Sequence, residues 1–77
     1  MTFIDRSAHY YAWAPGAGQS NRPILVALRE AGFLAQIGSR RTPAENFEVR
    51  CFAAERQTTV DIITAVDPAA RPLSVGR

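Results

Sequence analysis

The chain has 77 residues, of which 47% are hydrophobic and 21% charged, and its mean hydropathy is −0.11. This length is enough for a single small domain, and the composition is typical of a globular rather than a disordered chain. No apolar run approaches the roughly 20 residues of a membrane-spanning helix, and the first residues lack the pattern of a signal peptide. We therefore expect a cytoplasmic protein.

The charge pattern is weakly basic. All nine basic residues are arginine, and with seven acidic residues they give a net charge of +2 and a pI of about 9.3. Arginine suits bidentate contacts with phosphate or carboxylate, but codon preference in a GC-rich genome produces the same bias. Because acidic residues are interspersed with the arginines, the net charge alone does not indicate a nucleic-acid partner.

The content of metal-binding residues is low. Cys51 is the only cysteine, so no internal disulfide can form, which fits a reducing compartment. Together with His9 it offers too few ligands for a zinc site. We expect no metal and no cofactor.

The first predicted element is a strand over the aromatic segment 9–14. Strand alternation places Tyr11 and Trp13 on one face and Tyr10 on the other. Residues 15–18, Pro-Gly-Ala-Gly, predict a turn.

A helix over residues 21–31 has the clearest signals in the chain. Ser20 or Asn21 is a suitable N-cap, and Pro23 fits the first turn, where no backbone N–H is needed. Gly32 suits the left-handed position that ends a helix, with Phe33 folding back on the last turn. The apolar stripe of this helix consists of Ile24, Leu25, Leu28 and Ala31.

The segment after the helix predicts a strand at 33–37 and a break at 38–43. Residues 47–51 alternate between apolar and polar, which favours a strand. A possible capping box at 42–45 favours a helix over residues 43–57 instead. We prefer the strand.

The last predicted strand is the β-branched segment 60–66, preceded by a hairpin loop at 55–58. Residues 68–77 are predicted to form an irregular tail.

These elements predict an α+β fold in which residues 1–77 form one domain. One central helix packs on a small, mostly antiparallel sheet of three or four strands, in the order β-α-β-β-β. If residues 43–57 are helical, the order becomes β-α-β-α-β, and a small parallel sheet is the natural outcome.

Two groups of residues are candidates for binding. Gly18, Ser20 and Asn21 stand at a helix start, where free N–H groups and the helix dipole attract anions. This loop has no lysine and is therefore not a Walker A motif, and we prefer the interpretation that it is a glycine-rich connector with an ordinary helix cap. The second group, which could bind phosphate or a protein partner, consists of Tyr10, Arg22, Arg40, Arg41 and Arg50.

No catalytic set is visible, because Cys51 lies in an alternating apolar pattern that predicts a buried, inert thiol. We therefore expect a non-enzymatic protein-interaction module, regulatory or inhibitor-like, of the kind that phages and mobile elements carry. Its partner would be another protein or a second copy of the chain. The alternative is an RNA- or DNA-binding module that uses Arg40, Arg41 and exposed aromatic residues.

Overall fold

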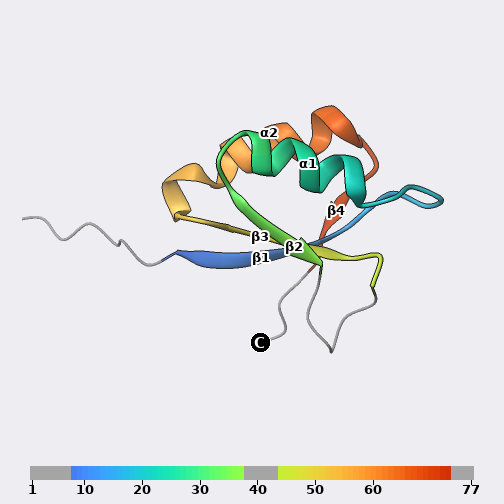
Figure 1. Ribbon diagram of the computed structural model, residues 1–77, viewed down its shortest axis with the longest axis horizontal. Helices are drawn as coiled ribbons and strands as arrows, with labels where there is room; N and C mark the ends of the chain where they lie inside the picture. Colours follow the sequence, from blue (N-terminus) through green and yellow to red (C-terminus); the bar gives the residue numbers. More distant parts are fainter. Residues whose placement is uncertain (1–7, 38–43, 74–77) are drawn as a thin grey trace, which may run out of the picture.

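The computed structural model describes residues 8–37 and 44–73. These residues form a four-stranded sheet with two α-helices on one of its faces (Figure 1). In chain order the elements are β1 (His9–Ala14), α1 (Arg22–Glu30), β2 (Leu34–Ile37), β3 (Phe47–Cys51), the 3₁₀ turn η1 (Ala53–Glu55), α2 (Arg56–Val66) and β4 (Arg71–Pro72).

The sheet has the order β2-β3-β1-β4, and every neighbouring pair is antiparallel. The predicted α+β class and antiparallel sheet are confirmed. With two helices, the element order is β-α-β-β-α-β, that of the split βαβ, or ferredoxin-like, arrangement. Both helices lie on the same side, so no described element covers the other side of the sheet (Figure 1).

Helix α1 forms where the sequence predicts it, within one residue at each end. Its C-terminus is a Schellman motif: Gly32 has φ +95°, its N–H donates to the Arg29 carbonyl, and the Phe33 N–H donates to the Leu28 carbonyl. Glycine adopts this left-handed conformation without the steric cost of a Cβ. The chain therefore reverses sharply from α1 into β2.

The core lies between the helices and the sheet. The stripe of α1 buries Ile24 and Leu28 completely, and α2 adds the fully buried Ile63. From the sheet, the core receives Trp13, Ala35, Phe47 and Val49. The aromatic rings of Trp13 and Phe47 are stacked, with centroids 6.5 Å apart and planes at 14°. All these residues belong to one hydrophobic cluster.

The predicted strand at 60–66 is wrong, since these residues form most of α2, and the predicted hairpin loop at 55–58 is its first turn. Burial follows the helical repeat: Thr59 and Ile63, four residues apart, are buried. The Thr64 hydroxyl donates to the Val60 carbonyl at 2.9 Å, a bond to the residue four positions earlier that threonine typically makes in a helix. Packing on the sheet thus outweighs the strand preference of β-branched residues.

The strand preferred at 47–51 is confirmed as β3, and the helical alternative for 43–57 is wrong over that stretch. Two residues of the segment predicted as an irregular tail, Arg71 and Pro72, form β4 beside β1. Among the described residues, no helix is long and apolar enough to cross a membrane.

Candidate functional site

The uncovered face of the sheet carries side chains from the three longer strands. The register places Arg50 of β3 between Tyr10 of β1 and Leu34 of β2, in one row across the sheet. Tyr10 is 49% exposed and Leu34 is 60% exposed. Directly opposite residues on antiparallel strands have Cβ atoms about 4.5–5.5 Å apart, so these three side chains form one continuous patch. We call this set the open-face row.

A second, more polar row lies beside the open-face row. It consists of Ala12, Glu48 and Gln36, with Glu48 in the middle. The Gln36 amide donates to the Glu48 carboxylate at 3.1 Å. Among the described residues, no carboxylate lies within ion-pair distance of Arg50, so its charge is available to a partner.

The structure brings together only part of the predicted binding group. Tyr10 and Arg50 are direct cross-strand neighbours on the open face. Arg22 is the first residue of α1 and belongs to the helical layer on the other side. Arg40 and Arg41 lie outside the described residues.

The residues at the start of α1 make hydrogen bonds within the chain. The Ser20 hydroxyl accepts the Arg22 N–H at 3.1 Å. The Asn21 side chain makes no cap bond; its amide donates to the carbonyls of Ala44, Glu45 and Asn46 at 3.0–3.3 Å. Asn21 therefore fastens the start of α1 to the segment that leads into β3. Gly18, with φ +77°, allows the turn before it.

The same turn also binds a carboxylate of the chain itself. The Gly16 N–H donates to Asp67 Oδ2 at 2.8 Å, and the Ala69 N–H donates to Asp67 Oδ1 at 3.0 Å. Asp67 is only 7% exposed. The buried carboxylate at the C-terminal end of α2 thus accepts one N–H of the glycine-rich turn and one N–H of the α2–β4 turn, which links the two turns.

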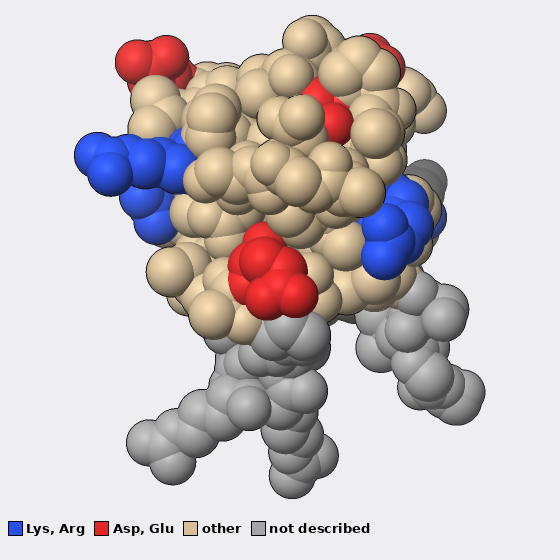
Figure 2. All heavy atoms as spheres, turned by 90° about the vertical axis from the view of Figure 1, so that its right-hand side faces the viewer, with Lys and Arg blue, Asp and Glu red and all other residues tan. Residues whose placement is uncertain are grey.

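Charges are scattered at this end of the molecule. Figure 2 faces the end where the glycine-rich turn lies, and its acidic and basic side chains are separated by uncharged surface. An open cavity of about 360 Å³ there is lined by Glu45 and Arg71, which carry opposite charges. This end therefore shows no continuous basic patch among the described residues.

Cys51 is buried, as its alternating pattern predicts. Burial is the main cause that raises the pKa of its thiol, and the charge of Glu55 raises it further, while a hydrogen bond with Thr59 and the charge of Arg56 lower it in part. His9 lies directly opposite Cys51 in the strand register. Because the thiolate is the nucleophilic form, a raised pKa makes this thiol less reactive at neutral pH.

A second site, which sequence reasoning missed, lies on the helical side of the sheet. It is an open cleft of about 590 Å³ between α2 and the β1–β4 side of the sheet. It is lined by Trp13, Ala53, Arg56, Gln57, Val60, Thr64, Ala70 and Pro72. Among the described residues, no group of histidine, cysteine and acidic side chains could hold a metal ion.

Comparison with known proteins gives no family for this chain: no protein-family model, curated protein or solved structure matches it. The surfaces described above are therefore the basis for a functional proposal.

Proposed function

We propose that the chain is a small non-enzymatic protein-interaction module that docks on another protein through the open face of its sheet. The observation that carries this proposal is the open-face row, in which Arg50 lies between the exposed residues Tyr10 and Leu34. Tyrosine and arginine are the residue types that most often supply binding energy at protein interfaces. Leu34 adds apolar area beside them.

The open-face row also defines the chemistry of the partner. Arg50 has no ion-pair partner among the described residues, so the partner should present a carboxylate opposite it. Apolar side chains of the partner would cover Tyr10 and Leu34. The neighbouring row is short and polar, with Ala12 beside Glu48, and would form the hydrated rim of the contact.

One observation favours the nucleic-acid alternative: Tyr10 and Arg50 are neighbours on the two central strands, where an aromatic ring could stack on a base. However, this face also carries an acidic residue, Glu48, next to Arg50, and its other arginine, Arg71 of β4, lies opposite Ala14 at the edge of the sheet. A phosphate backbone would therefore meet a net charge of only +1 among the described residues of this face. The protein partner is therefore the better supported of the two.

The test is a comparison of two variants with matched changes on opposite sides of the molecule. One combines Tyr10→Ser with Arg50→Glu on the open face. The control combines Val26→Ser, where Val26 is 45% exposed, with Arg22→Glu, both on α1. Each variant is immobilised, and the proteins that it retains from cell extract are quantified by mass spectrometry.

We expect the wild type and the α1 control to retain the same partner, and the open-face variant to retain at least about tenfold less, equivalent to 1.4 kcal/mol. Size-exclusion chromatography with light scattering shows whether this partner is a second copy of the chain. Equal retention by all three proteins would contradict the proposal. Tight RNA or DNA binding that weakens steeply with salt, without a retained protein, would support the alternative instead.

A further inference from the structure

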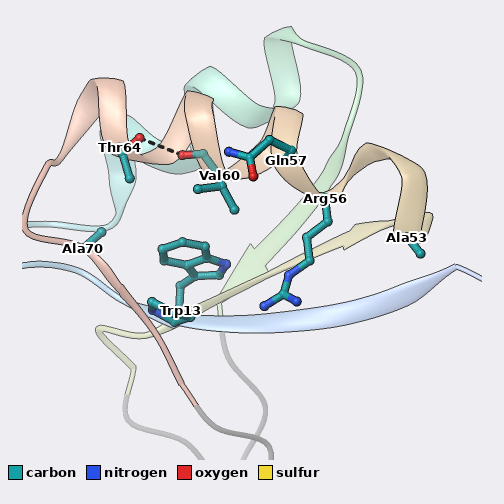
Figure 3. A pocket seen from close by; sticks show the side chains of 8 residues that line it. Trp13, Ala53, Arg56, Gln57, Val60, Thr64 and Ala70 are labelled. Carbon is teal, nitrogen blue, oxygen red and sulfur yellow. Dashed lines mark hydrogen bonds between the residues drawn. The ribbon is translucent and has the colours of Figure 1, made fainter.

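We propose that the cleft between α2 and the β1–β4 side of the sheet binds a small organic carboxylate with an apolar body. The cleft lies on the helical side of the sheet (Figure 3), opposite the open-face row, so this inference does not depend on the docking proposal. Its volume of about 590 Å³ is within the range of ligand pockets.

The cleft exists because β4 is short. Arg71 and Pro72 pair only with the end of β1, at Ala14 and Trp13. The rest of β1 on this side has no neighbouring strand among the described residues, and α2 crosses above it (Figure 3).

The walls of the cleft are largely apolar and well fixed. Trp13 is 4% exposed, and the stacked ring of Phe47 supports it from the core. Val60 of α2 and Ala70, both packed against the core, complete this wall. An apolar group can therefore lie against Val60 and Ala70 and touch the small exposed part of the indole without any rearrangement of the core.

The indole N–H of Trp13 is a free hydrogen-bond donor in this cleft. Among the described residues, no acceptor bonds to it. Every completely buried side-chain nitrogen or oxygen of these residues has a hydrogen-bond partner, so a nitrogen without one is not completely buried. The indole nitrogen must therefore reach the surface of the cleft. In Figure 3 it is turned to the side on which the Arg56 side chain enters.

Arg56 supplies the charge. Its guanidinium lies over the ring of Tyr11, 4.7 Å from the ring centroid, and this cation–π contact holds it above the sheet. No carboxylate of the described residues lies within ion-pair distance of it. Arg56 lines the cleft, and a guanidinium that already rests on the Tyr11 ring loses less conformational entropy when a ligand binds.

The other polar groups of the cleft are already engaged as donors. The Gln57 amide donates to Asp61 at 2.9 Å, and the Thr64 hydroxyl donates to the Val60 carbonyl. The free donors are therefore the indole N–H, the guanidinium of Arg56 and the second N–H of the Gln57 amide. A carboxylate, with one negative charge and two acceptor oxygens, matches one cation surrounded by neutral donors. A phosphate would bring more charge than the single cation of the cleft balances.

The experiment uses the fact that Trp13 is the only tryptophan of the chain. Its indole N–H gives one signal in a proton–nitrogen correlation spectrum, and this signal is followed while the full chain is titrated with phenylacetate. Phenylacetamide, which has the same shape without the charge, and inorganic phosphate at equal ionic strength are titrated in parallel. Two variants are compared, Arg56→Gln in the cleft and Arg50→Gln on the open face.

We expect phenylacetate to shift the indole signal saturably, and phenylacetamide and phosphate to have little effect. Arg56→Gln should weaken binding about tenfold or more, while Arg50→Gln changes it less than about twofold. Because Arg56 is exposed, its variant should keep the native spectrum elsewhere. The inference is overturned if the indole signal does not move, if phenylacetamide or phosphate binds equally well, or if Arg56→Gln has no effect.

Discussion

The buried carboxylate of Asp67 links two turns that are far apart in the sequence, and its replacement by alanine should cost much of the stability of the fold. The variant loses the bonds from the N–H groups of Gly16 and Ala69. An unpaired buried N–H costs about 1–3 kcal/mol, and the second, less buried bond adds about 1 kcal/mol. We therefore expect Asp67→Ala to lower the free energy of unfolding by about 2–4 kcal/mol, where a domain of 77 residues has about 4–12 kcal/mol in total.

Two further variants make this prediction specific. Asp67→Asn keeps one acceptor oxygen and should lose about 1–2 kcal/mol. Asp61→Ala, the same change at an exposed position of α2, should stay within about 0.5 kcal/mol of the wild type. Urea unfolding followed by the fluorescence of Trp13 measures all three. If Asp67→Ala and Asp61→Ala cost the same, Asp67 does not hold the turns together.

Three other changes test further contacts. Gly16→Ala should destabilise the protein by at least about 1 kcal/mol, because the new Cβ would lie 2.6 Å from the Cβ of Ala69; an unchanged urea midpoint would contradict this. Arg29→Ala removes the bond from its Nε to the Ala35 carbonyl on the edge strand β2, and should cost about 1 kcal/mol in the same assay. The Cys51 thiol should react with Ellman's reagent more slowly in the folded than in the urea-unfolded chain, because its pKa is raised. Because folding raises the pKa of this thiol above its ordinary value of 9.0, we also expect the free energy of unfolding to decline as the pH rises above about 9. Cys51→Ala should remove this decline.

Local signals in the sequence were sufficient for α1 and β3. The proline near the start of α1 and Gly32 after its end fix the two helix ends through local steric effects. The alternation over 47–51 reflects the one buried face of β3. The segment 60–66 is different, because its β-branched residues favour a strand locally while packing on the sheet makes it helical. The sequence does contain one signal for the start of this helical segment, Glu55. Its side chain accepts the Phe52 N–H at 3.0 Å, which is half of a capping box.

The candidate sites divide in the same way. Tyr10 and Arg50 could be placed among binding residues from exposure and residue type, but only the register shows that they are neighbours. The cleft could not be predicted, because Trp13, Arg56 and Pro72 come from three elements that tertiary packing brings together. Trp13 belongs to the hydrophobic core and at the same time lines the cleft, which strand alternation alone does not indicate.

The most direct test of the docking proposal is photo-crosslinking from the open face in cells. A benzophenone amino acid replaces Tyr10, which it resembles in shape, and a control chain carries it at Val26 on α1. We predict a protein adduct of defined mass from position 10 and none of that mass from position 26. Adducts with nucleic acid alone, or the same protein adducts from both positions, would contradict docking on a protein through this face.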